Sequence, residues 1–325
     1  LELFVIRWLG CELQAFRVFK SFPLATCFIG MGVGCASGND KWFKYTPLAL
    51  LLFAVLARVP VFFHIDWVSL PTMSVFVEWE NVFQFKDDLI RYLVFFAGYL
   101  VLVLSGVYAP MYCLGSKIGV LMKEMRPLTA YGINLAGSIV GSLLFSVLAL
   151  AGLPPWLLFL PLCVLLAVIC VQKGWKEILV VAALCGALGL TVWDRYNSPD
   201  IVTYWSPYQR LDIMPARLGT GNAKDESKYY AGVEVFSNHI SYQYCIDWIS
   251  ANQPGSTAPA AAREYLKQAS QRHILPFALK PGGDVLVVGA GTGNDVAEGL
   301  RHNPKSIDAV DIDPCILEAG RRFNA

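Results

Sequence analysis

A series of long apolar segments in the first 193 residues places the strongest constraint on how this chain can fold. A helix needs about 20 apolar residues to cross a bilayer, and six segments reach or approach that length: Phe22–Ala36, Thr46–His64, Leu89–Leu114, Leu128–Ala151, Leu153–Val171 and Ile178–Trp193. The 325-residue chain is 55% hydrophobic and only 16% charged, with a mean hydropathy of +0.49. A soluble protein of this size rarely has that composition, so residues 1–193 are predicted to form a helical membrane domain of about six spans.

Charged residues close to these segments are interpreted as interfacial. The stretch from Leu3 to Phe19 carries Arg7 and Glu12 among apolar residues and is predicted to lie at the membrane surface. Arg58 falls inside the second segment, and no acidic residue lies within the six spans. Its side chain is therefore expected to reach toward the lipid headgroups.

Small residues cluster in two of the apolar segments. Gly30, Gly32 and Gly34 occupy alternate positions of the first one, with no strand before them, and they predict close packing of two helices. The stretch Tyr131–Gly141 places Asn134 and several small residues on one helix face. We expect another helix to pack there with Asn134 as a hydrogen-bonded partner, because six spans without buried acids support a transport route poorly.

The composition changes to that of a soluble protein from Asp194 onward. Three short apolar or alternating runs predict strands: Tyr208–Met214, Gly232–Phe236 and Ile240–Cys245. Ser237-Asn238 between the last two runs predicts a hairpin turn. A small β-hairpin domain is therefore predicted over residues 194–250.

The last part, residues 251–325, is predicted to be the first half of a Rossmann-like, nucleoside-binding domain. A helix is expected over Ala261–Arg272, leading through Leu275-Pro276 to a sheet, and the polar stretch Gly219–Lys228 before it is expected to be a mobile loop. The predicted fold is an α-helical transmembrane bundle followed by a small β-domain and a partial Rossmann-like, methyltransferase-type α/β domain.

A strand, a glycine turn and a helix start follow one another at Asp284–Asp295. Gly289, Gly291 and Gly293 let the backbone turn sharply and approach a ligand without an intervening Cβ. A second apolar run ends in Asp311, 18 residues after Gly293, where its carboxylate can accept both hydroxyls of a ribose. The pattern predicts a nucleoside site, and the alternative is a purely structural βαβ turn.

The soluble part resembles the polyamine aminopropyltransferases, the spermidine synthase family. The similar stretches are Trp205–Leu211, a hairpin containing Gln243, Leu275-Pro276, the glycine strand and Asp311–Pro314. The chain is most similar to the multi-span, membrane-bound members of that family, in which a helical membrane half precedes a small β-domain and a methyltransferase-like sheet. Tyr131–Gly141 is similar to their membrane portion.

This resemblance implies a transferase that binds S-adenosylmethionine or decarboxylated S-adenosylmethionine and transfers an aminopropyl or methyl group to a small-molecule amine. The cofactor-binding residues it implies are Gly289, Gly291, Gly293, Asp311, Gln209 and Gln243. The glycines would approach the nucleoside and its amino-acid-derived tail, and Asp311 would hold the ribose. The two glutamines would line the hairpin side of the pocket, or else be exposed strand residues.

Several positions depart from the family pattern. Thr292 stands where the soluble synthases carry an aspartate that helps to hold the cosubstrate. Arg272 and His273 stand near the place of a Tyr-x-Glu-like motif. The family's catalytic aspartate follows the third and fourth strands, which are expected beyond Ala325, so no catalytic residue is assigned. These departures leave an alternative: a catalytically degenerate scaffold subunit of a larger membrane complex.

The remaining predictions concern partners and location. A net charge of +1 gives no case for nucleic acid, and the scattered cysteines and histidines have no metal-ligand spacing. Membrane lipid is expected as a partner, together with other membrane proteins or a second copy of the chain. The protein is predicted to be integral to a cell or inner membrane.

The soluble part is predicted to face the cytoplasm, where nucleoside cosubstrates are found. With six spans, this orientation would place the acidic connection Asp66–Asp88 inside and several lysine-containing loops outside. That arrangement is contrary to the positive-inside tendency, so one of the six spans is expected to be miscounted.

Overall fold

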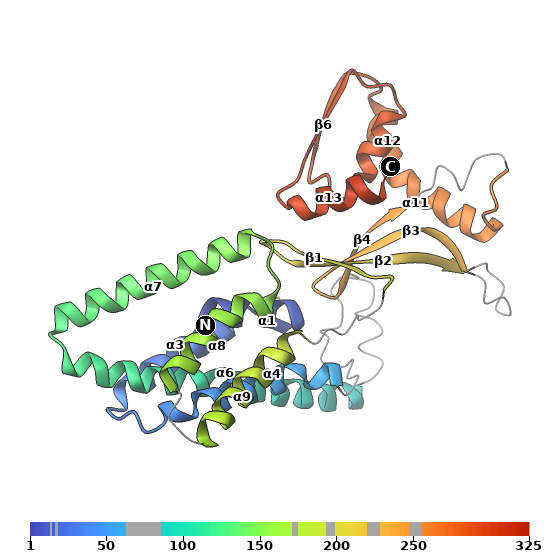
Figure 1. Cartoon of the computed structure of the whole chain (residues 1–325). Helices are drawn as coiled ribbons and strands as arrows, with labels where there is room; N and C mark the ends of the chain where they lie inside the picture. The colour runs from blue at the N-terminus through green and yellow to red at the C-terminus, as the bar shows by residue number, and fades with distance from the viewer. Residues whose placement is uncertain are drawn as a thin grey trace. The chain divides into compact units, whose positions relative to one another are not determined.

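The computed structural model divides the chain into two compact units, Leu1–Arg195 and Tyr196–Ala325, which are described separately (Figure 1). The structure describes residues 1–13, 15–16, 19–62, 86–170, 175–192, 199–219, 228–246 and 255–324. Most of the predicted Asp66–Asp88 connection and of the Gly219–Lys228 loop lies outside these residues. The first unit is mostly helical; the second holds a four-stranded antiparallel sheet and a two-stranded parallel sheet.

The helices of the first unit follow the apolar segments closely. They are α1 (Glu2–Glu12), α3 (Ser21–Ala36), the 3₁₀ turn η1 (Phe43–Tyr45), α4 (Thr46–Phe62), α6 (Lys86–Glu124), α7 (Pro127–Leu150), α8 (Pro155–Cys170) and α9 (Trp175–Val192). Within the described residues, three stretches are long and apolar enough to cross a membrane: Phe43–Pro60, Val94–Glu124 and Pro127–Leu150. The helices α3, α8 and α9 contain shorter apolar stretches, so the count of six spans remains a prediction.

Glycines bring α3 and α6 into backbone contact, as the sequence predicted. A Cβ on Gly30 would lie 2.9 Å from the carbonyl oxygen of Tyr108, and a Cβ on Gly34 would meet the α6 backbone more closely still. Gly115 on α6 has the reciprocal role against α3, whereas Gly32 faces open space. The small residues therefore allow the two helices to approach each other more closely than side chains would permit.

The helix α1 is part of the core of the helical unit, a burial that its sequence did not predict. Phe4, Trp8 and Leu9 are at most 3% exposed. The Phe4 ring stacks on Phe159 at 4.5 Å between centroids, and Trp8 packs edge-on against Phe53. The charged residues at positions 7 and 12 concealed this burial because they interrupt the apolar pattern.

Arg58 is buried and paired, so the expectation that it reaches toward the headgroups was wrong. Its Nη1 lies 2.5 Å from Oε2 of Glu12, and the two side chains are 2% and 3% exposed. Its Nε donates to the carbonyl oxygen of Leu190 at 2.8 Å, and its guanidinium lies 5.5 Å from the centre of the Trp8 ring. The acid partner comes from α1, which the sequence had not counted among the spans.

The helix α7 contrasts with the α3–α6 pair because it is almost entirely exposed. Within α7, all of whose residues are described, only Ala130 and Ala149 are buried. Gly132, Gly137 and Gly141 have no atom within 4 Å of a Cβ built on them, and Asn134 is exposed. The close packing expected for this face is not found among the described residues.

The second unit begins with an antiparallel sheet in which the strands are ordered as in the chain (Figure 1). Its strands are β1 (Val202–Trp205), β2 (Arg210–Gly219), β3 (Lys228–Ser237) and β4 (Ile240–Ile246). The β3–β4 turn is formed by Asn238 and His239, both with positive φ, so the hairpin is present with its turn one residue beyond the predicted position. Two central residues with positive φ suit the right-handed twist of the flanking strands.

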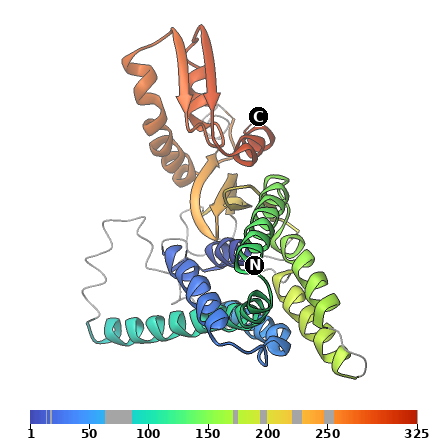
Figure 2. The same cartoon turned by 90° about the vertical axis from the view of Figure 1, so that its left-hand side faces the viewer.

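A βαβ unit completes the second unit (Figure 2). The helix α11 (Ala260–Leu279) runs on through Leu275 and Pro276, past the predicted end at Arg272. It is followed by β5 (Asp284–Val288), α12 (Asn294–Leu300), β6 (Ser306–Val310) and α13 (Pro314–Phe323), and β5 and β6 are parallel neighbours. Ile316 and Ala319 of α13 pack on the antiparallel sheet.

Candidate functional site

The candidate site is built around the turn between β5 and α12. Gly289, Gly291 and Gly293 all have positive φ, at 73°, 56° and 88°, a region that side chains with a Cβ rarely adopt. The N–H groups of Gly289 and Ala290 both donate to the carbonyl oxygen of Val310, at 2.8 and 3.0 Å. The turn is therefore held against the end of β6.

Asp311 follows the last residue of β6 and directs its carboxylate at this turn. Its Oδ2 accepts from the N–H of Gly291 at 2.9 Å, and its Oδ1 accepts from the N–H of Asp313 at 2.9 Å. A carboxylate offers about four lone-pair sites. Each oxygen of Asp311 therefore keeps acceptor capacity for a further donor such as a ribose hydroxyl.

Gln209 lies away from the glycine turn, in a network that connects the antiparallel sheet to α13. Its Nε2 donates to Oδ2 of Asp313 at 3.0 Å, and its Oε1 accepts from Ser237 Oγ at 2.6 Å. Asp313 is 1% exposed and also accepts from Ser206 Oγ at 2.8 Å. These contacts occupy the Gln209 amide in holding the sheet to the start of α13.

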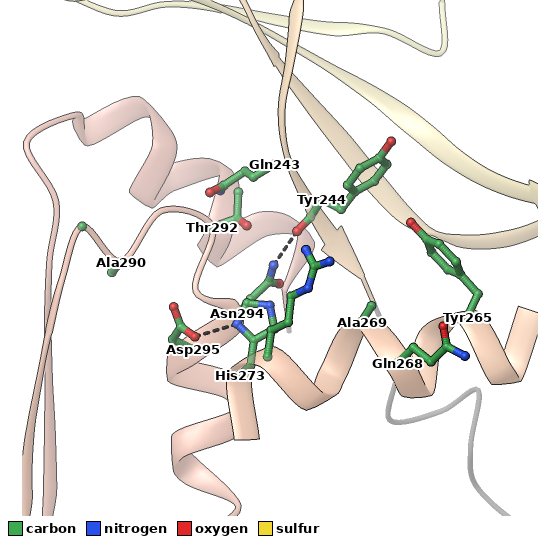
Figure 3. A pocket seen from close by; sticks show the side chains of 12 residues that line it. Gln243, Tyr244, Tyr265, Gln268, Ala269, His273, Ala290, Thr292, Asn294 and Asp295 are labelled. Atoms are coloured by element: carbon green, nitrogen blue, oxygen red, sulfur yellow. Dashed lines mark hydrogen bonds and ion pairs between the residues drawn. The ribbon is translucent and has the colours of Figure 1, made fainter. Parts of the chain in front are cut away.

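A cavity of about 390 Å³ lies beside the turn, within the size range of small-molecule sites. Three segments line it: β4, one face of α11, and the turn with the start of α12 (Figure 3). The lining residues are Gln243, Tyr244, Tyr265, Gln268, Ala269, Arg272, His273, Gly289, Ala290, Thr292, Asn294 and Asp295. Most of the lining side chains are polar, so the cavity is suited to a hydrogen-bonding ligand.

Gln243 reaches the glycine turn from β4. A Cβ on Gly291 would lie 2.5 Å from Oε1 and 2.9 Å from Nε2 of Gln243. Gly291 is therefore required for its backbone conformation and also for the space that the Gln243 amide occupies. The sequence placed Gln243 at this pocket through a resemblance, and the structure places its side chain in the lining.

Two further contacts join the three segments of the lining (Figure 3). His273 Nδ1 on α11 lies 2.6 Å from Oδ1 of Asp295 on α12. The side-chain amide of Asn294 donates to the backbone carbonyl of Tyr244 on β4. Partial burial and, to a smaller extent, the neighbouring Glu234 carboxylate raise the pKa of Tyr244.

Three buried polar atoms of the lining have no hydrogen-bond partner among the described residues. They are Nε2 of Gln243, Oγ1 of Thr292 and Oδ1 of Asn294, and Thr292 as a whole is 2% exposed. Buried polar groups in native proteins are nearly always satisfied by protein, water or ligand. Each of these atoms has less than 1 Å² of accessible surface, so they lie within the wall of the cavity and not on the surface that a bound molecule would contact.

The structure brings most of the predicted site residues together. Gly289 and Gln243 line the cavity, Gly291 contacts both Gln243 and Asp311, and Gly293 precedes α12. Gln209 does not line the cavity, because its side chain is bonded to Asp313 and Ser237. Sequence reasoning assigned no site role to the polar face of α11, whose members recur at three- and four-residue intervals, the spacing of one helix face: Tyr265, Gln268, Ala269, Arg272 and His273.

Comparison of the chain with models of known protein families, with curated proteins and with solved structures finds no match.

Proposed function

We propose that this protein is a membrane-bound, spermidine synthase-like transferase that binds S-adenosylmethionine or its decarboxylated form and transfers an alkyl group to an amine. The observation that carries the proposal is the contact between Asp311 and the glycine turn. The two strands that bear them are parallel neighbours, and the Asp311 carboxylate bonds the N–H of Gly291. A carboxylate at one strand tip beside a glycine turn at the next is the arrangement that grips a nucleoside in open α/β sheets.

The reaction in this proposal is a displacement at a carbon bonded to the sulfonium. The amine lone pair forms the new C–N bond while the C–S bond breaks and its electrons return to sulfur, which leaves a neutral thioether. The amine then gives up one proton to a base. The protein contributes alignment of the amine with the reacting carbon and the placement of that base, and we assign the base to no residue.

The membrane location is proposed from the surface of the helical unit. On α7, Leu128, Val140 and Val147 are between 62% and 84% exposed. A helix with so many large apolar side chains exposed to water would be unfavourable, whereas lipid tails cover such a surface at no hydrophobic cost. We place the second unit on the cytoplasmic side, where sulfonium nucleosides are made.

Binding of methylthioadenosine to the purified full chain tests the nucleoside site. This ligand carries the adenosine and the thioether without an amino-acid tail. We expect Asp311→Ala to weaken its binding at least about tenfold, because a ribose loses a charge-assisted acceptor. Asp308→Ala is the matched control, since it removes an exposed acid from β6, the strand that Asp311 follows, and should leave binding unchanged. If unmodified protein does not bind methylthioadenosine, the proposal fails.

The second candidate is a scaffold subunit of a larger membrane complex, which the exposed small-residue face of α7 favours. Gly137 and Gly141 offer a surface on which another helix could approach closely, with Asn134 exposed beside them. Co-purification with other membrane proteins at fixed stoichiometry, lost on Gly137→Leu and retained on Leu143→Ala, would select this function. A homogeneous preparation that binds methylthioadenosine without partners would exclude it.

A further inference from the structure

We propose that one end of the helical unit, where α3 leads into α4 and α6 leads into α7, binds the headgroups of anionic phospholipids. We call this surface the basic end and define it by its four exposed basic side chains: Lys41, Lys44, Lys123 and Arg126. The inference rests on the membrane location proposed above and not on the transferase activity.

The basic end coincides with one boundary of the apolar helices. All three described stretches that are long and apolar enough to cross a membrane have an end here: Phe43–Pro60 begins, Val94–Glu124 ends and Pro127–Leu150 begins. A membrane crossed by these stretches has its hydrocarbon core along their length and its headgroups beyond their ends. The basic side chains therefore lie at the level of the headgroups.

Contacts between the α3–α4 connection and α6 bring these side chains together. Nζ of Lys117 on α6 lies 2.7 Å from Oδ2 of Asp40 in the connection. A Cβ on Gly38 would lie 3.0 Å from Nζ of Lys123, so this second lysine of α6 also reaches the connection. The connection therefore lies against the C-terminal part of α6, and the basic residues of both segments share one surface.

The charge of this surface is strongly positive. Residues 37–45 and 117–130, all of them described, contain two acids, Asp40 and Glu124, and Asp40 is paired with Lys117. The four side chains of the basic end are thus opposed by a single exposed acid, Glu124. Lysine and arginine bind phosphate through charge-assisted hydrogen bonds, and basic clusters beside membrane spans attract anionic lipids.

Two exposed aromatic rings beside the lysines favour a lipid surface over an acidic protein partner. Trp42 and Tyr45 are 51% and 44% exposed, and their ring centroids lie 5.9 Å apart. Nζ of Lys44 lies 5.0 Å from the centre of the Tyr45 ring. Tryptophan and tyrosine concentrate at headgroup level, where the ring contacts acyl chains and its polar atom contacts water. Charge alone would suit an acidic protein, whereas charge and exposed rings together suit a bilayer surface.

The test is the lipid selectivity at Trp42 in the full chain, reconstituted into phosphatidylcholine vesicles that contain phosphatidylglycerol. One lipid or the other is brominated near the headgroup end of its acyl chains, and the bromine quenches the fluorescence of an adjacent tryptophan. Because the chain has nine tryptophans, the Trp42 signal is the difference between the unmodified protein and Trp42→Phe. We expect a preference for phosphatidylglycerol of about fivefold or more, which falls as added salt screens the exposed charges.

Two double variants, each lacking two lysines, identify the surface responsible. Lys41→Gln combined with Lys44→Gln should lower the preference to about twofold or less. Lys267→Gln combined with Lys280→Gln removes two exposed lysines from the second unit and should leave the preference unchanged.

Equal quenching by the two brominated lipids overturns the inference, as does a preference that the first double variant retains in full. Protein that inserts into vesicles of neither composition overturns the membrane location together with this inference. Binding of methylthioadenosine by the same preparation reports separately on the nucleoside site, so failure of the proposed transferase function is distinguished from failure of lipid selectivity.

Discussion

Two segments of this molecule share the same glycine spacing and use it in opposite ways. Gly30, Gly32 and Gly34 lie within a regular helix, and two of the three allow the α6 backbone to approach. In the turn after β5, Gly289, Gly291 and Gly293 all adopt positive φ. Gly30 and Gly34 are needed for the small volume of glycine, whereas the turn glycines are needed for their conformational freedom, and Gly291 is needed for its small volume as well. The spacing alone therefore does not define a function, and the flanking residues decide which property is used.

The first prediction tests which contact contributes more to the stability of the helical unit: the close approach of α3 and α6, or the buried ion pair between Glu12 and Arg58. Glu12→Ala would leave the Arg58 guanidinium buried without its acid. We expect a loss of about 3–5 kcal/mol in the free energy of unfolding, the usual cost of removing one partner of a buried pair. Chemical denaturation in detergent measures it, and Glu2→Ala on the same helix is the control. A loss below about 1 kcal/mol would indicate that the α3–α6 contact at the glycines contributes more to stability than the ion pair does.

The second prediction sharpens the contrast within the helical triplet. Gly34→Leu would drive a side chain into the α6 backbone and should destabilise the unit by about 3 kcal/mol. Gly32→Leu, two residues away, meets no atom within 4 Å and should change stability by no more than about 0.5 kcal/mol. Both are measured by the same denaturation. Similar losses for the two variants would show that the helices are not held by close approach.

The third prediction distinguishes glycines needed for their small volume from glycines needed for their backbone conformation. Alanine and asparagine should rank in opposite order of destabilisation at the two kinds of site. At Gly293, with φ of 88° and ψ of 19°, alanine should cost about 1 kcal/mol and asparagine about half of that, because asparagine tolerates the left-handed region. At Gly34 asparagine should be the more harmful, since it is larger. Hydrogen exchange over Asn294–Leu300 and denaturation of the helical unit give the two readouts. If alanine and asparagine rank in the same order of destabilisation at Gly293 and Gly34, the two sites do not differ in what they require of glycine.

Local patterns account for what the sequence predicted correctly. The helices α3, α4, α7, α8 and α9 follow long apolar runs, interrupted in α4 by Arg58, and such runs indicate a helix whatever distant residues surround it. The strand β5, the glycine turn and the acid at the end of β6 form one contiguous pattern in which each element restricts the next. Asp311 could be located because parallel neighbouring strands end at the same edge of a sheet.

The predictions that failed depend on contacts between distant residues. Arg58 pairs with Glu12, which lies 46 positions earlier in the chain. Glu12 belongs to α1, a helix whose charged residues suggested that it would be exposed. The cavity takes its lining from β4, α11 and α12, and no spacing in the sequence joins Tyr265 to Thr292. Pro276 does not end α11, which continues to Leu279, because a proline inside a helix can be accommodated by a kink.

Asp313 connects the antiparallel sheet to Asp311. It anchors Ser206 and Gln209, while its own backbone N–H orients the carboxylate of Asp311. The antiparallel sheet therefore cannot shift away from α13 without disturbing the group that would grip a ribose. Under the proposed function, a displacement of the β1–β2 corner would alter the ribose site, and binding of a nucleoside would in return restrict the motion of that corner.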